Sequence, residues 1–158
     1  MGDILKINWK KLIVFIVVTF VIGGFFSFFI NSRGFYNSLE KPPLSPPGIL
    51  FPIVWSILYT LMGISLYIVS ESNSLDKEQS YLIYIVQLIV NSLWTLLFFG
   101  FGLKFISFLW IILLIVLVVI MLINFYKINK VAGLLQLPYL LWLFFAGYLN
   151  LAIFILNR

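Results

Sequence analysis

The sequence contains no cysteine and no histidine, and only 9% of its 158 residues are charged. These absences exclude disulfides, thiol nucleophiles, imidazole bases and the commonest ligands of zinc, copper and haem iron, so we expect no metal site and no resident cofactor. A typical soluble domain carries roughly 25% charged residues. This chain is instead 63% apolar and 19% aromatic. The composition predicts an integral membrane protein.

The charged residues leave five charge-free stretches, each long enough to cross about 30 Å of hydrocarbon as a helix of about 20 residues. No alternation of period two is sustained, which disfavours a barrel. The sequence therefore predicts an all-α membrane protein with one domain over residues 1–158, a bundle of five transmembrane helices. We expect the first span to be retained and not cleaved as a signal peptide. The expected helices lie near residues 11–31, 51–70, 79–100, 104–126 and 132–156.

Lysine and arginine residues in the loops predict the orientation of a membrane protein. Those expected on the N-terminal side are Lys6, Lys10, Lys11, Lys77, Lys127 and Lys130, and those on the other side are Arg33, Lys41, Lys104 and Arg158. The excess predicts a multi-pass protein of a bacterial cell membrane with a cytoplasmic N-terminus. Because the net charge of +5 is divided between two faces, lipid headgroups explain it better than nucleic acid, and no nucleic-acid partner is expected.

No Asp, Glu, Lys or Arg lies in the interior of a predicted span, since Lys11 and Lys104 are terminal residues. Ion-coupled transporters usually carry an ionisable group at membrane depth, and general acid–base catalysis needs one at the reacting site. The sequence therefore disfavours a coupled pump, an ion channel and an ordinary hydrolase or transferase. Tyrosine and tryptophan are the residues left in the spans with redox or proton chemistry of their own.

Amide and aromatic side chains recur at helical spacing in the second, third and fifth spans. Because an amide in hydrocarbon must be hydrogen-bonded, these faces should point into the bundle, either as contacts between helices or as walls of a pocket. Their depths place them in the half of the bilayer beneath the loop that joins the first two spans. The expected pocket residues are Trp55, Tyr59, Asn91, Trp94, Trp110, Tyr139, Trp142, Ala146 and Asn150.

The longest stretch without a predicted helix is residues 32–50, and five of the six prolines fall between Pro42 and Pro52. Prolines stiffen a loop as extended or polyproline segments, so this stretch is either a lid across the mouth of the bundle or an ordered connector. Pro138 lies inside the last predicted span, where it either kinks the helix or is tolerated without a kink.

A specific pattern links this loop to the spans. In the loop and second span it comprises Tyr36, Leu39, Lys41, Pro42, Pro46, Pro47, Phe51, Val54, Trp55, Leu58, Tyr59, Met62, Gly63 and Tyr67. In the third and fifth spans it comprises Gln87, Asn91, Trp94, Phe98, Phe99, Gly100, Pro138, Tyr139, Trp142, Phe145, Ala146, Leu149 and Asn150. With these residues the chain resembles the TspO/MBR family, which is also known as the translocator protein or tryptophan-rich sensory protein family.

The resemblance implies a five-helix bundle, often a homodimer in the lipid bilayer, that binds porphyrins such as protoporphyrin IX and other flat hydrophobic ligands. The positions that match the family's ligand cavity are Trp55, Asn91, Trp94, Trp142, Ala146 and Leu149. The resemblance also implies an alternative, a light- and oxygen-dependent degradation of porphyrin in which Trp55 and Trp142 would be catalytic. Transport of the ligand across the membrane and a structural or stress-regulating role are further alternatives.

Two positions differ from the family pattern. Leu44 stands where the family's loop has tryptophan, and Leu151 stands where a sterol-binding motif would need tyrosine, so a sterol ligand is not favoured. For a porphyrin, the loop-side cations Arg33, Lys41 and Lys104 are candidates to contact the propionates. The absence of histidine favours a metal-free porphyrin over haem.

Overall fold

The computed structural model describes residues 7–158, so Lys6 lies outside the described part, and within that range the chain forms helices and loops without a strand. Its α-helices are α1 (Trp9–Gly23), α2 (Ser32–Ser38), α3 (Leu50–Glu71), α4 (Lys77–Thr95), α5 (Lys104–Ile128), α6 (Lys130–Leu134) and α7 (Leu137–Leu156). Two shorter turns complete them, the 3₁₀ turn η1 (Phe25–Phe28) and the π-helical turn η2 (Leu96–Gly100). The all-helical prediction is confirmed.

Four helical segments of the described chain are long and apolar enough to cross a membrane. They are Leu50–Glu71, Lys77–Gly100, Lys104–Ile128 and Lys130–Leu156. The outer faces of these helices expose large apolar side chains such as Ile57, Val116 and Phe144, which water would solvate poorly and lipid tails would accept. The chain is therefore a multi-pass integral membrane protein.

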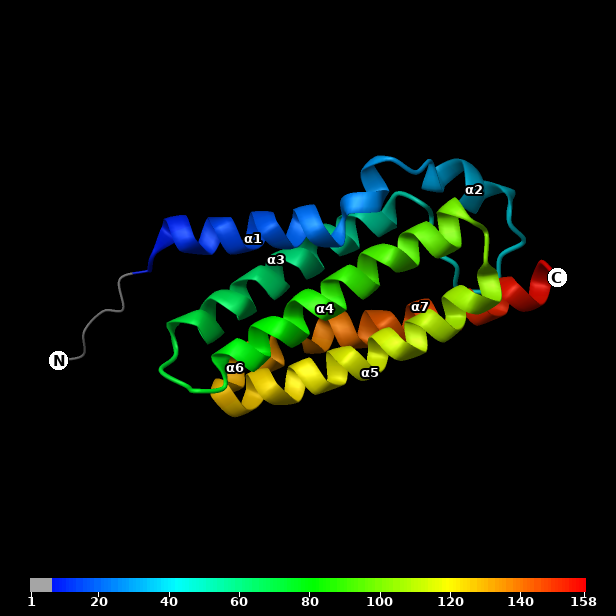
Figure 1. Cartoon of the computed structure of the whole chain (residues 1–158). Coiled ribbons are helices and arrows are strands. Elements are labelled where there is room, and N and C mark those ends of the chain that lie inside the picture. The colour runs from blue at the N-terminus through cyan, green and yellow to red at the C-terminus, as the bar shows by residue number, and fades with distance from the viewer. Residues whose placement is uncertain (1–6) are drawn as a thin grey trace.

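The first predicted span is shorter than expected. The sequence predicts a helix over residues 11–31, whereas α1 ends at Gly23 and covers 15 residues, about 22 Å along its axis. Two consecutive glycines disfavour helix continuation, and the second, Gly24, leads directly into η1. Figure 1 shows α1 and α2 following one another along one side of the bundle, with the break between them.

The loop prediction is wrong for its first part, because residues 32–38 form the helix α2. The Asn31 side chain caps this helix by accepting a hydrogen bond from the Gly34 N–H at 3.2 Å. The proline-rich remainder, residues 39–49, connects α2 to α3 without regular structure. Its residue Leu44 is exposed and has a positive φ of 67°, a left-handed conformation that is rare outside glycine, asparagine and aspartate.

The last predicted span is two helices in the structure, α6 and α7, which are separated at residues 135–136. Pro138 is the second residue of α7 and does not kink its interior. In the first turn of a helix the backbone N–H groups have no partner within the helix, so the missing N–H of proline costs nothing there. The expected span is thus interrupted at the turn that precedes Pro138, and the interior of α7 contains no proline.

The bundle core lies between the long helices, with α1 packed against α3 and α5 packed against both α4 and α7 (Figure 1). Its fully buried side chains include Met62, Tyr84, Leu88 and Phe125. Gly63 on α3 allows the closest approach of α1, because a Cβ at this position would lie 2.7 Å from the Ile16 Cα.

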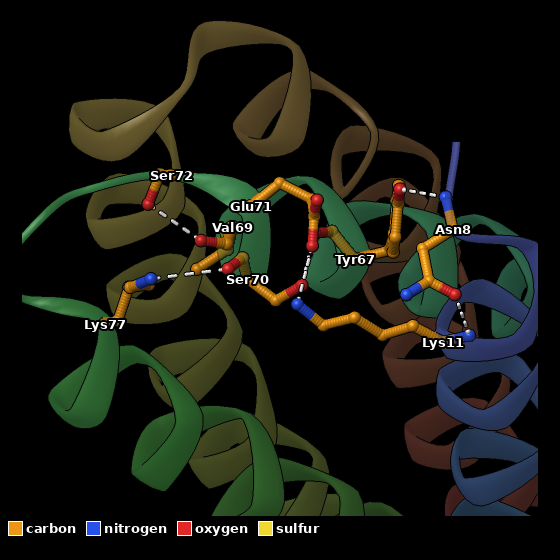
Figure 2. A network of polar contacts seen from close by, with 8 residues as sticks. All are labelled: Asn8, Lys11, Tyr67, Val69, Ser70, Glu71, Ser72 and Lys77. Atoms are coloured by element: carbon orange, nitrogen blue, oxygen red, sulfur yellow. Dashed lines mark hydrogen bonds and ion pairs between the residues drawn. The ribbon is translucent and has the colours of Figure 1, made fainter. Parts of the chain in front are cut away.

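A polar network holds the start of α1 to the end of α3 (Figure 2). The Asn8 backbone N–H donates to the Tyr67 hydroxyl at 3.0 Å, and the Lys11 ammonium pairs with the Glu71 carboxylate at 2.6 Å. Lys77 donates to a carbonyl in the last turn of α3 at 3.3 Å. This network lies at the end of the bundle that is remote from α2 (Figure 1), so it positions α1 without contributing to the site described below.

We predict that Gly63→Ala lowers the stability of the bundle. The added methyl group would overlap the Ile16 backbone, and such overpacking costs about 1–3 kcal/mol. Gly147→Ala is the matched control, because a Cβ there meets Ile111 at an ordinary 3.5 Å. Thermal unfolding in detergent micelles measures both variants, and equal midpoints for the two would contradict the proposed close contact of α1 with α3.

Candidate ligand-binding site

A cavity of about 430 Å³ lies between α1, η1, α2, α3 and the last turns of α4 with η2. This volume is within the range of about 300–1,000 Å³ that is typical of small-molecule sites. Its walls are mainly aromatic: Phe20, Phe28, Tyr36, Phe51, Trp55, Tyr59, Trp94 and Phe99. Its polar lining consists of Ser27, Ser32, Arg33, Ser56 and Thr95.

Tyr59 lies at the base of the cavity with its ring held on several sides. The Trp55 ring is 5.2 Å away and the Phe20 ring 5.4 Å away, measured between centroids. The Tyr59 hydroxyl accepts a hydrogen bond from the Asn91 amide at 2.9 Å. Gly23 leaves room for this ring, because a Cβ there would lie 2.6 Å from it. The Tyr59 ring therefore packs directly against the glycine at which α1 ends.

Trp94 forms a wall from α4 and is oriented by α7. Its indole N–H donates to the Asn150 side-chain oxygen at 3.0 Å, and the Asn150 amide donates to the Lys104 carbonyl at 2.8 Å. The ring stacks on Phe98 with the two planes 9° apart and the centroids 5.3 Å apart. Because both the N–H and one face are engaged, the Trp94 ring has a defined orientation at the cavity wall.

The roof of the cavity consists of α2 and part of the loop after it. Tyr36 is buried there and donates a hydrogen bond from its hydroxyl to the Pro46 carbonyl at 2.8 Å. Burial raises the pKa of the Tyr36 phenol, so this donor stays protonated at neutral pH. The loop is also held to α7, because the Tyr148 hydroxyl donates to the Pro43 carbonyl at 2.9 Å.

The Asn157 side chain adds a two-way contact to the same loop. It accepts from the Glu40 N–H at 2.9 Å and donates to the Glu40 carbonyl at 2.8 Å. Hydrogen bonds from α2, from α7 and from Asn157 at the end of α7 thus hold the proline-rich segment in place.

Four of the residues expected at the site line this cavity: Arg33, Trp55, Tyr59 and Trp94. Asn91 and Asn150 lie behind the wall and bond the rings that form it. Three further candidates lie away from the lining. Tyr139 donates to Gln87 at 3.0 Å, Trp110 donates to the Val90 carbonyl at 2.8 Å, and Leu149 is buried outside the lining.

Trp142 lies outside the main cavity, and the half-buried Ala146 is not part of its lining. Trp142 lines a second, more open hollow of about 390 Å³ between α3 and α7, together with Pro138 and other apolar residues. Its ring lies 6.0 Å from the ring of Phe51, a residue of the main cavity lining, measured between centroids. The side chains of Lys41 and Lys104 also lie outside the lining.

The first segment of the chain contributes residues to the cavity that no sequence pattern had indicated. Phe20, Gly24, Ser27 and Phe28 line the cavity from α1 and η1, although none of them was among the candidates. The consecutive glycines at 23 and 24 are the signal that could have found them, because a break in the helix redirects the chain over the second span.

The fold and cavity define a multi-pass helical membrane protein with an aromatic pocket beneath a proline-rich cover. The TspO/MBR family model matches residues 13–156, and the chain belongs to the TspO/MBR family. The resemblance drawn from the sequence motifs is therefore confirmed.

Named relatives cover most of the chain. The "Tryptophan-rich protein TspO" of Archaeoglobus fulgidus is 38% identical over 152 residues, which are 95% of this chain and 99% of that protein. "Protein CrtK" of Rhodobacter capsulatus is 38% identical over 77% of this chain and 78% of its own length. The "Translocator protein" of Bos taurus is 33% identical over 82% of this chain and 80% of its own length.

We predict that Trp94 and Asn150 are energetically coupled. Trp94→Phe removes the indole donor and Asn150→Leu removes its acceptor, so the double variant should lose less stability than the sum of the two single variants. A buried hydrogen bond of this kind gives a coupling of about 1–2 kcal/mol. Unfolding free energies in mixed micelles measure the cycle.

The matched cycle combines Asn150→Leu with Trp110→Phe, whose indole bonds the Val90 carbonyl instead. This second cycle should be additive within about 0.5 kcal/mol. Additivity in the first cycle as well would show that Asn150 does not orient the cavity wall.

Proposed function

We propose that the protein is an integral membrane binding protein for porphyrins, such as protoporphyrin IX, and similar flat hydrophobic molecules. The observation that carries this proposal is the aromatic lining, in which Trp55, Tyr59 and Trp94 come from two helices and surround one space beneath α2. Indole and phenol rings offer faces and edges on which a macrocycle can stack. Membership in the TspO/MBR family supports the same ligand class.

The proposed porphyrin is metal-free. The sequence has no histidine and no cysteine. These two residue types are the commonest axial ligands of haem iron. A metal-free macrocycle needs only stacking, apolar burial and a counter-ion for its propionates, which the aromatic walls and Arg33 can supply.

The membrane arrangement is part of the proposal. We propose that α1 and η1 together form a fifth crossing, the one expected near residues 11–31, within a single domain over residues 1–158. In this arrangement the lysine-rich end shown in Figure 2 faces the cytoplasm of a bacterial cell, and two copies of the chain form a homodimer. The bound porphyrin would then lie in the half of the bilayer opposite the N-terminus, for transport or for stress regulation.

A second candidate function is light- and oxygen-dependent degradation of the bound porphyrin. The observation that favours it is the position of Trp55, which lines the cavity and lies 5.2 Å from the Tyr59 ring and 6.1 Å from the Tyr139 ring. Such an aromatic cluster can donate an electron to an excited macrocycle. Trp142, the other candidate for this chemistry, lies outside this lining and beside Phe51.

We predict that Trp55→Ala weakens protoporphyrin IX binding by about tenfold or more, because it removes a stacking face and its buried apolar area. Trp142→Ala should change the affinity by at most about threefold, since this residue lies outside the cavity. Quenching of protein fluorescence during titration gives the affinities. Trp9→Ala is the control, because Trp9 is 64% exposed and remote from the cavity. A larger loss in Trp142→Ala than in Trp55→Ala would move the site to the hollow between α3 and α7.

If the second function holds, illumination of the porphyrin complex in oxygenated buffer should convert the porphyrin absorbance into that of an open-chain product. Trp55→Phe should slow this conversion about tenfold or more, since phenylalanine is a far poorer electron donor. Trp110→Phe is the control, because Trp110 does not line the cavity. Bleaching at the same rate in the wild type, in Trp55→Phe and in free porphyrin would reject the activity and leave binding unaffected.

A further inference from the structure

The three cations expected near a ligand's acidic groups occupy different positions in the structure. Arg33 on α2 lines the cavity, and within residues 7–158 its side chain makes no hydrogen bond and no ion pair. The Lys41 ammonium lies 5.0 Å from the centre of the Tyr36 ring and donates to the Leu39 carbonyl at 3.2 Å. The Lys41 ammonium therefore already has partners in the roof of the cavity. The side chain of Lys104, at the start of α5, lies outside the lining.

Arg33 belongs to the rim of the cavity and not to its base. The exposed lining residues, among them Phe28 at 75% exposure and Ser56, surround the opening, whereas Tyr59 and Gly24 are buried at depth. The Ser56 hydroxyl donates to the Pro52 carbonyl at 2.7 Å within its own helix, so its polarity is already satisfied. The guanidinium is therefore the one charged group of the described lining, and it lies where a bound molecule would leave the apolar interior.

A lone guanidinium recognises one anionic group. Its planar donors match a single carboxylate or phosphate in a two-point contact, and a long arginine side chain can keep its charge in the polar zone while its stem lies along apolar surface. The described lining offers no cation for a second anionic group, which would have to stay at the open rim in water or among headgroups.

We propose that the cavity selects amphipathic molecules by a single anionic group, which Arg33 binds at the rim while the flat apolar body lies against Trp55 and Trp94. The inference rests on the proposed function of this site and narrows its ligand class. One carboxylate of a porphyrin is recognised, the second is dispensable, and flat monocarboxylic acids without a macrocycle are ligands of the same class.

The test compares protoporphyrin IX with its monomethyl and dimethyl esters. Titrations in dodecyl maltoside, which contains no phosphate, leave no lipid headgroup to occupy Arg33. The diacid and the monoester should bind within about twofold of each other, and the diester about tenfold or more weakly. Arg33→Gln should weaken the diacid and monoester to the level of the diester and leave the diester unchanged, and Arg33→Lys should restore part of the loss. Lys104→Gln is the matched control and should leave all three affinities unchanged.

Three results would overturn the inference. Equal losses for each ester group would show two separate cation contacts. An equal loss of the diester in Arg33→Gln would show that the variant disturbs the cavity as a whole. A loss of acid selectivity in Lys41→Gln, with Arg33→Gln unaffected, would assign the contact to the other cation.

A second probe separates this inference from the porphyrin proposal. If no porphyrin binds, 1-pyrenebutyric acid and its methyl ester are titrated in the same way. Preference for the acid that disappears in Arg33→Gln would support single-anion recognition while the porphyrin proposal fails. Equal affinities for acid and ester, or a preference that survives in Arg33→Gln, would contradict the inference itself. Repeating the titrations in phosphatidylcholine vesicles with and without phosphatidylglycerol then tells whether an anionic lipid headgroup competes for Arg33.

Discussion

Hydrocarbon contains no water, so a polar side chain inside a membrane bundle must find its hydrogen-bond partner within the protein. Three such side-chain pairs join α4 to α3 and α7. Gln87 accepts from Tyr139, Asn91 donates to Tyr59, and Trp94 donates to Asn150. In each pair one member is on α4 and the other is on α3 or α7, so α4 fixes the register of two neighbouring helices.

The same pairs determine the shape of the candidate site. Two of them end on rings that line the cavity, since Tyr59 is held by Asn91 from behind and Trp94 by Asn150. The amides thus act on a ligand through the aromatic rings that they orient. The short first helix supplies the other half of the site: α1 approaches α3 closely at Gly63, breaks after Gly23 beside the Tyr59 ring, and continues as the roof.

The sequence predicted the long helices well because few charged residues interrupt their apolar runs. The expected helices at 51–70 and 104–126 correspond to Leu50–Glu71 and Lys104–Ile128. The breaks after Gly23 and before α7 were missed because apolarity continues through them, and tertiary contacts decide where the helix stops. Periodicity also identified the inward faces, but it does not distinguish a wall residue such as Trp55 from Asn91 behind the wall or Trp142 beyond it.

In the proposed function, the space beneath α2 holds a flat ligand against Trp55 and Trp94. The most direct measurement is a crystal or cryo-electron microscopy structure of the protein with protoporphyrin IX. We expect the macrocycle to lie between these two indoles with a carboxylate at Arg33. A macrocycle seated against Trp142 and Pro138 in the hollow between α3 and α7, with the space beneath α2 empty, would contradict it.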